Sequence, residues 1–373
     1  MAVRGILVDD ESLALRGLEN QLRKLGGIEI VGTYRNPVEA LEAAARSKPD
    51  VVFLDIEMPE VSGIEAALDF QDLSPSPQIV FVTAYEEYAV KAFELEALDY
   101  VLKPCRTERL ALTLQRVAER LQAASDTPDE LRKGAIRCLG RLQVEVGPNE
   151  FLAWRTAKAQ ELFAYLTLRA GQPVRKDVLV EILWPESDQK KAYTQLYTTI
   201  YQLRRTLEAA RLPLRIVNSS NSYSLERNGM ETDAEQWERQ LPSEAEIASL
   251  ALEDYEEKMS LNRGELFEDS GYLWAEHERE RLSSLWFHHA KRLGKRHDEN
   301  NDAIMASTWY NRILQRFPYS EEMYFTLMEL YARLGERSLV EQHYSRLCAM
   351  TQNEYGTEPS AEVQTWYLNW KKE

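Results

Sequence analysis

Five polar residues stand directly after short apolar runs of the sequence. Asp9 and Asp10 end the run GILVDD, Asp55 follows VVFL, Thr83 follows QIVFV and Lys103 follows DYVL. Carboxylates that meet at one place cannot all ionise unless a cation offsets them, and oxygen ligands with some retained waters suit Mg²⁺. A carboxylate beside Mg²⁺ can attack a phosphoryl donor, because the metal neutralises charge that develops on the equatorial oxygens. Lys103 would add a second positive charge, and Thr83 would donate a hydrogen bond to the phosphoryl group.

The elements that must bring these residues together are buried strands. Within residues 1–124 the runs GILVDD, IEIVGTY, VVFLDIE, QIVFVTA and DYVLK are rich in Val, Ile, Leu and Phe, and each precedes a helix-like stretch. This alternation predicts an α/β fold, a doubly wound five-stranded parallel sheet with helices on both faces. Ligand sites of such sheets lie at the carboxyl ends of the strands, which is where the five polar residues are expected.

The motifs VDDE, FLDIEMP, FVTAY and DYVLKP, in this order and spacing, resemble the receiver domain of two-component response regulators. The resemblance covers about the first 120 residues. It implies that Asp55 accepts a phosphoryl group from a sensor histidine kinase. It also implies that Asp9, Asp10, Asp55 and the main-chain carbonyl of Glu57 bind Mg²⁺. A phosphatase of the haloacid dehalogenase type would need a second Asp at position 57, so Glu57 argues against that class of enzyme.

The same resemblance assigns roles to residues around the fourth and fifth apolar runs. Thr83 and Tyr100 match the family's switch pair, although Tyr100 taken alone would indicate half-buried packing. The bond between Lys103 and Pro104 matches a common cis peptide bond that aims the lysine inward. Cys105 stands where the family often has Phe, and this departure concerns packing. We expect phosphorylation to reorient Thr83 and Tyr100, repack the fourth helix and fifth strand, and favour a DNA-competent homodimer.

Composition shifts divide the rest of the chain. The polar segment SDTPDELRKG contains Pro and Gly and predicts a linker, whereas the sequence after about Thr232 is helix-like, acidic and rich in Tyr and Trp. We therefore expect a receiver over residues 1–124, a linker over 125–134, an α+β winged helix over 135–228 and an all-α domain over 232–373.

Charge separates the winged-helix segment from its neighbours. The chain has a net charge of -16, which by itself argues against a nucleic-acid partner, because DNA binding depends on Lys and Arg that neutralise phosphates. Residues 134–229, however, contain 14 Lys and Arg against 9 Asp and Glu, a local net charge of +5. Segregated basic charge of this kind is typical of one DNA-binding domain flanked by acidic domains.

A predicted helix over residues 189–209 is the candidate for contacting base edges in the major groove of DNA. Its buried stripe is predicted at Ala192, Leu196, Ile200, Leu203 and Leu207. The preceding helix, Arg175 to Trp184, and the hairpin candidate LRIVNSSNSYSLE complete a helix-turn-helix with a wing. The predicted DNA contacts are Lys190, Lys191, Tyr193, Thr194, Tyr197, Thr198, Arg204, Arg205 and Arg215. Tyr193, Tyr197 and Tyr201 could equally pack against a neighbouring domain.

The segments RTAKAQELFAYLTLRAG, DVLVEILWPE and LYTTIYQLRRTLE resemble the OmpR/PhoB-type winged helix of SARP-type transcriptional activators. The segments YEEKMSLNRGELF, LWAEHERERL and FPYSEEMYFTLMELYARLGE resemble the bacterial transcriptional activator domain that follows it. The resemblance implies transcriptional control through double-stranded DNA, with RNA polymerase as a further partner. Trp274 and Trp309 lie about one helical repeat apart, which indicates a tetratricopeptide-like array of helical hairpins.

Other features of the sequence narrow the functional class. There is no apolar run of the length that spans a membrane, and MAVRGILVDD lacks a signal core, so we expect a cytoplasmic protein without a membrane partner. Cys105, Cys138 and Cys348 are far apart and are expected to be reduced. We expect a regulator and not an enzyme. The alternative is a phosphorylation-gated regulator that binds a protein through its helical domain and does not bind DNA.

Overall fold

The protein is described here by a computed structural model that covers residues 3–59, 61–71, 73, 76–85, 97–124, 132, 134–169, 171–219 and 221–372. These residues fall into two compact units. Unit 1 consists of Met1–Ala135 and Val144–Met230, and unit 2 consists of Ile136–Gln143 and Glu231–Glu373. Most of the predicted linker, residues 125–131 and 133, lies outside the described residues, as does the segment 86–96 in which the fourth helix was expected.

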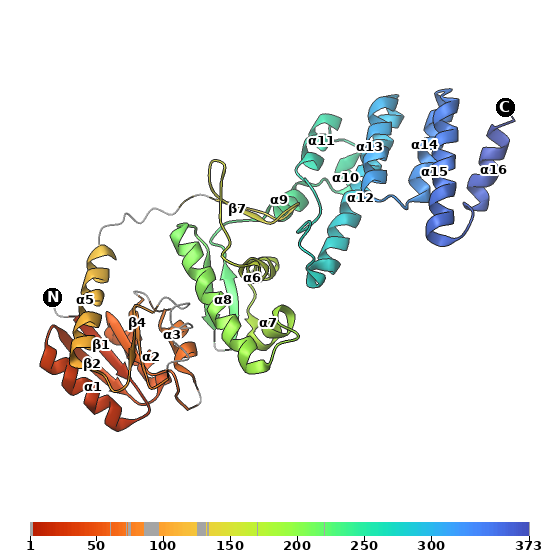
Figure 1. The fold of residues 1–373 in the computed structure, drawn as a ribbon. Helices are drawn as coiled ribbons and strands as arrows, with labels where there is room; N and C mark the ends of the chain where they lie inside the picture. Colours follow the sequence, from red (N-terminus) through yellow and green to blue (C-terminus); the bar gives the residue numbers. More distant parts are fainter. Residues whose placement is uncertain are drawn as a thin grey trace. The chain divides into compact units, whose positions relative to one another are not determined.

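Unit 1 begins with the predicted parallel sheet, drawn in red and orange in Figure 1. The five strands run in the order β2-β1-β3-β4-β5, and every pairing is parallel. The doubly wound fold class predicted from the apolar runs is therefore confirmed. The strands are β1 Val3–Val8, β2 Ile28–Tyr34, β3 Val51–Leu54, β4 Gln78–Thr83 and β5 Asp99–Leu102.

Helices cover both faces of this sheet. The core cluster on one face joins the inward residues of α1 and α5 to the sheet, and the cluster on the other face joins those of α2 and α3. Asn36 caps α2 by accepting a hydrogen bond from the Val38 main chain, and Pro37 occupies the first helical position. The helices are α1 Ser12–Leu25, α2 Pro37–Ser47, α3 Gly63–Gln71 and α5 Thr107–Ala124.

The described residues in the remainder of unit 1 form three helices and two small groups of strands. Helix α8 has the bounds that the sequence predicts, Gln189–Ala209, and Asp188 caps it by accepting hydrogen bonds from the main chains of Lys190 and Lys191. Its five predicted stripe residues are all buried. The predicted hairpin is present as β10 paired with β11, and β11 also pairs with β9. The other elements are β7 Gln143–Gly147, β8 Glu150–Phe151, α6 Ala157–Leu168, β9 Val174–Arg175, α7 Lys176–Leu183, β10 Arg215–Ser219 and β11 Ser222–Glu226.

Unit 2 takes in a short segment that the sequence had assigned to the winged helix. The main-chain N–H groups of Cys138 and Leu139 donate to the Asp233 carboxylate, and Phe267 N–H donates to the Cys138 carbonyl. These bonds give main-chain groups of the segment Ile136–Gln143 hydrogen-bond partners within the helical unit. The segment contains most of β6, Ala135–Arg137.

The rest of unit 2 is helical, as predicted. Helices α12 and α13 pack together as one pair and α14 and α15 as the next (Figure 1), which is the arrangement expected of helical hairpins. A buried hydrogen bond of 2.7 Å joins the Tyr255 hydroxyl to Nδ1 of His289 inside this unit. The elements are α9 Asp233–Gln240, α10 Glu244–Ile247, α11 Leu252–Ser260, a 3₁₀ turn at Leu273–Ala275, α12 Glu276–Glu299, α13 Ala303–Arg316, α14 Glu321–Arg333, α15 Arg337–Tyr355 and α16 Ala361–Trp370. Over the described part of the chain, every helix is too short or too polar to cross a membrane.

Candidate functional site

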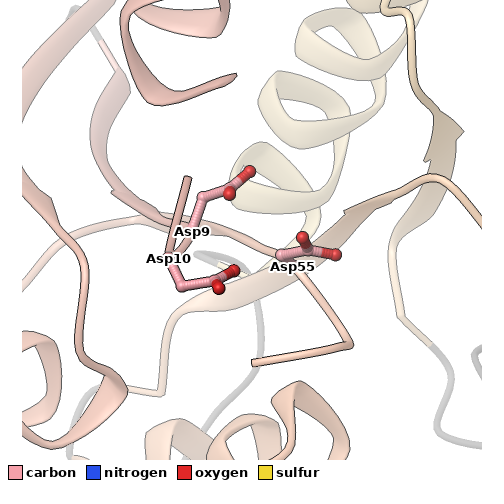
Figure 2. Close-up of side chains that lie close together, drawn as sticks. All are labelled: Asp9, Asp10 and Asp55. Atoms are coloured by element: carbon pink, nitrogen blue, oxygen red, sulfur yellow. The ribbon is translucent and has the colours of Figure 1, made fainter. Parts of the chain in front are cut away.

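Three carboxylates meet where β1 and β3 end. Asp9 and Asp10 follow β1, Asp55 follows β3, and Figure 2 shows the three side chains gathered at this edge of the sheet. One carboxylate oxygen from each lies within 4.8 Å of the others. Asp9 and Asp55 are only 4% and 6% exposed, because the parallel strands on either side bury the positions directly after them. The predicted convergence of these three residues is therefore present.

Lys103 supplies the positive charge at this site. It follows β5, and its Nζ lies 2.7 Å from Oδ2 of Asp9 and 2.7 Å from Oδ2 of Asp55. Burial acts to lower the pKa of Lys103, but hydrogen bonds to Asp55 and Asp9 outweigh it and raise the pKa. Burial raises the pKa of Asp9, and the neighbouring Asp55 charge adds to the effect. The peptide bond between Lys103 and Pro104 is cis, as the sequence resemblance implied.

The donor set fits a hard divalent cation. Three carboxylates face a single ammonium, which leaves two negative charges that one divalent cation would balance, and Mg²⁺ prefers such oxygen ligands. Glu57 lies in the loop after β3 with an exposed side chain, and the role of its main-chain carbonyl stays a prediction. The other oxygen of Asp55, Oδ1, accepts a hydrogen bond of 2.7 Å from the Ile56 main chain, which fixes the carboxylate orientation.

The predicted switch pair, Thr83 and Tyr100, is connected through one residue. Thr83 is fully buried at the end of β4, and its Oγ1 accepts a hydrogen bond of 3.4 Å from the main chain of Tyr85. The hydroxyl of Tyr100 on β5 donates to the carbonyl of Tyr85. A displacement of Thr83 toward the three carboxylates would therefore be transmitted to Tyr100 through the backbone of Tyr85.

The predicted DNA contacts on α8 and β10 separate into an exposed or partly exposed group and a buried group. Lys190, Lys191 and Arg215 are exposed, and Thr194, Thr198 and Arg205 are partly exposed. The expectation of an open face is wrong for Tyr197 and Arg204, which are 7% and 8% exposed. Tyr197 and Tyr201 belong to a core cluster of the α/β sheet, and Tyr193 packs against that cluster.

The three tyrosines therefore pack against a neighbouring domain, which is the alternative that the sequence left open. A Tyr can bury its ring against a neighbour while it keeps a polar tip, so its presence on a polar helix face does not distinguish DNA from protein. One residue of this interface was missed by the sequence analysis altogether. Lys176, the first residue of α7, is 2% exposed, and no pattern around a lone lysine at a helix start indicates burial.

Three family models match the chain in order. They are the response regulator receiver domain at residues 6–115, the C-terminal domain of transcriptional regulatory proteins at 153–221 and the bacterial transcriptional activator domain at 232–368.

Individual relatives give the same picture. An uncharacterized response regulatory protein of Vibrio cholerae is 47% identical over 123 residues, which cover 33% of this chain and 52% of the relative. The chain spans about half the length of this protein and of two similar response regulatory proteins, from Yersinia pestis and Shewanella oneidensis. The transcriptional regulatory protein BtsR of Escherichia coli K12 is 31% identical over 231 residues, covering 61% of this chain and 92% of BtsR. Mycobacterium tuberculosis EmbR, solved in complex with a low affinity phosphopeptide, shares the fold alone, with a TM-score of 0.52, 17% identity and 65% coverage of each chain.

Proposed function

This chain belongs to the response regulators, and on that premise we propose that phosphorylation of Asp55 by a sensor histidine kinase controls sequence-specific DNA binding and transcription. The α/β domain is the receiver, the domain of α6 to β11 is the winged helix, and α9 to α16 form the transcriptional activator domain. We place this activity in the cytoplasm, with Mg²⁺ as the cofactor, a homodimer as the phosphorylated form and RNA polymerase as the partner of the helical domain.

The observation that carries the proposal is the position of Asp55 between Lys103 and the Ile56 main chain. Lys103 Nζ and Ile56 N–H each hold one oxygen of the carboxylate, so Asp55 is oriented before a donor arrives. An oxygen of Asp55 attacks phosphorus of the kinase phosphohistidine. The new O–P bond forms while the N–P bond breaks, and the histidine nitrogen keeps the electron pair.

Charge compensation at the site would be shared between Lys103 and a bound Mg²⁺. When bound by Asp9, Asp10 and Asp55, Mg²⁺ would neutralise charge on the phosphoryl oxygens. Lys103 then moves its contact from the Asp55 carboxylate to a phosphoryl oxygen, and the hydroxyl of Thr83 donates to another. The chain acts here as the phosphate acceptor, and the proposal assigns it no turnover of an outside substrate.

Labelling with acetyl phosphate tests the phosphorylation step. The substitution Asp55→Asn should abolish incorporation of phosphate, because the amide is not a nucleophile. Asp50→Asn is the matched control, since Asp50 stands just before β3 and its carboxylate accepts a hydrogen bond from the Arg4 main chain. Full labelling of the Asp55→Asn protein would refute the assignment.

A salt titration tests the DNA-binding step. Binding to random and genomic-fragment DNA is measured with and without beryllofluoride, which mimics the phosphoryl group on Asp55. We expect binding that weakens with salt and tightens on beryllofluoride. Alanine at Lys190, Lys191 and Arg215 should weaken binding and reduce the salt slope by about one per lost phosphate contact. Alanine at Arg16 and Lys24, exposed on α1, is the control.

The second candidate function is a phosphorylation-gated regulator that binds a protein through the helical domain without DNA. The net charge of -16 and the burial of Tyr197 and Arg204 favour it. Beryllofluoride uptake without any salt-sensitive DNA binding would support this candidate against the first.

A further inference from the structure

One flank of α8 is covered by the receiver. Tyr197 and Tyr201 share a single core cluster with Ile64 and Leu68 of α3, and Tyr193 packs against it. The three tyrosines recur every fourth residue, so they lie along one side of the helix. This side is separate from the apolar stripe that α8 buries inside the winged helix.

Polar contacts join the end of α3 to the winged helix. Arg204 Nη1 donates to the Leu68 carbonyl at 3.3 Å, and Asn218 Nδ2 on β10 donates to the Asp69 carboxylate. Leu68 is among the last four residues of α3, whose carbonyls have no partner within the helix. A guanidinium from α8 therefore satisfies the C-terminal end of a receiver helix, where a positive charge is also favoured by the helix dipole.

An ion pair between a buried lysine and a partly exposed glutamate forms a third connection. Nζ of Lys176 lies 3.1 Å from Oε1 of Glu65 on α3 and over the rings of Tyr197 and Tyr223 at 5.3 and 5.2 Å. Burial of an ammonium is costly unless an opposite charge accompanies it. The receiver thus provides the carboxylate for a buried lysine of the winged helix. Burial and the adjacent Glu65 also raise the pKa of Tyr197, which keeps its hydroxyl neutral.

The opposite end of α3 touches the phosphorylation site. Gly63, its first residue, donates a main-chain hydrogen bond of 2.8 Å to the Ile56 carbonyl. A Cβ at residue 63 would lie 1.8 Å from the Asp55 carbonyl oxygen, so the helix begins in direct contact with the backbone of the phosphoacceptor. A helix this short moves as one rigid element, and a shift at Gly63 reaches Leu68 and Asp69.

We propose that the surface of α3 formed by Glu65, Leu68 and Asp69 is the docking site of α8 when Asp55 is unphosphorylated, and that α3 transmits the state of Asp55 to it. This inference rests on the DNA binding proposed above. The covered flank of α8 cannot contact α3 and DNA together, so docking competes with DNA. Phosphorylation at Asp55 shifts α3, releases Tyr197 and Arg204 and raises the affinity for DNA. The route differs from the one expected through the fourth helix and fifth strand.

The first test removes two receiver carboxylates from the docking surface. In the full chain without beryllofluoride, Glu65→Ala with Asp69→Ala should tighten DNA binding by roughly tenfold, toward the value of the beryllofluoride-treated parent. Glu39→Ala with Glu42→Ala is the control, because it makes the same change of charge at exposed positions of the neighbouring helix α2. Equal affinities of the two double variants would overturn the proposal.

The second test follows Lys176 and needs no DNA. Reaction with an amine-directed acylating reagent, measured by mass spectrometry, should leave Lys176 protected in the parent relative to the exposed Lys190. Beryllofluoride, or the Glu65→Ala and Asp69→Ala pair, should raise its reactivity severalfold, whereas the α2 pair should not. Unchanged protection of Lys176 under all four conditions would exclude release of the docking surface.

The two measurements separate this inference from the proposed function. If beryllofluoride tightens DNA binding while Lys176 stays protected, DNA binding stands and the α3 docking surface fails. If Lys176 becomes reactive on beryllofluoride but DNA is bound in neither state, the docking surface stands and the DNA-binding proposal fails.

Discussion

The main-chain carbonyl oxygen of Asp55 lies so close to Gly63 that a Cβ on residue 63 would approach it to 1.8 Å. Backbone and backbone meet here without a side chain between them, and the only residue that permits this contact is glycine. Asp55, the proposed phosphoacceptor, and the first residue of α3 are therefore in direct backbone contact although they are eight positions apart in the sequence.

Gly63→Ala should destabilise the receiver by about 3 kcal/mol, because the added carbon overlaps a carbonyl oxygen held in the sheet and the backbone must shift. Gly17→Ala, in the middle of α1 with nothing within 4 Å of its Cβ position, should instead stabilise by about 1 kcal/mol. Urea unfolding of both variants measures the difference. Similar free energies of unfolding for the two would show that residue 63 has more room than the structure indicates.

Lys103→Met should lower the stability of the receiver in the absence of Mg²⁺ by about 3 kcal/mol, since it leaves the buried Asp9 and Asp55 carboxylates without their shared ammonium. Saturating Mg²⁺ should recover part of this loss, because the cation replaces the missing charge. The control is Lys24→Met at an exposed position of α1. Thermal unfolding with and without Mg²⁺ measures the loss of stability in each condition. An equal loss of stability in both conditions would contradict Mg²⁺ binding by these carboxylates.

His289 should make unit 2 sensitive to mild acid. Burial lowers its pKa from 6.5 to about 4, and its Nδ1 is bonded to the Tyr255 hydroxyl. The unfolded chain therefore binds a proton more readily than the folded one, so stability falls as pH drops from about 6.5 to about 4. The total loss is roughly 3 kcal/mol at 1.36 kcal/mol per pKa unit. Denaturant titrations across this range should show the slope, and His289→Gln should remove it.

Gly294→Ala should loosen the contact between α12 and α13. A Cβ at residue 294 would meet the ring of Tyr310 at 2.6 Å, so the ring or the helix must move, at a cost of about 2 kcal/mol. The loss should shrink when Tyr310→Leu is present, because the smaller side chain leaves space. A double-mutant cycle measures the coupling, and additive losses would mean that the two residues do not clash.

The sequence was sufficient for the elements and for the acidic site because local pattern determines both. Strand ends in a parallel sheet lie at one edge, so the positions of Asp9, Asp55 and Lys103 after apolar runs already imply that they meet. The bounds of α8 could be predicted as 189–209 because Asp188 is a strong N-cap and the apolar stripe keeps its period throughout.

What the sequence could not provide is which polar surface is covered by another domain. The period of α8 identifies its own buried stripe, but Tyr197 and Arg204 have the same residue types whether they face DNA, water or α3. The burial of Lys176 depends on Glu65, which is more than 100 positions away. The attachment of Ile136–Gln143 to unit 2 likewise depends on Asp233, a partner that no local propensity reveals.

The attachment of Ile136–Gln143 to unit 2 has a consequence for recombination between genes that encode regulators of this kind. The polypeptide enters unit 2 at residue 136, returns to unit 1 at 144 and leaves it again at 231, so the helical domain is encoded in two separate stretches. In a chimera spliced at residue 231, Cys138 and Leu139 would be joined to a foreign helical domain without Asp233. Their main-chain N–H groups would then lose this acceptor. Exchange of this output module between regulators therefore has to move residues 136–143 along with it.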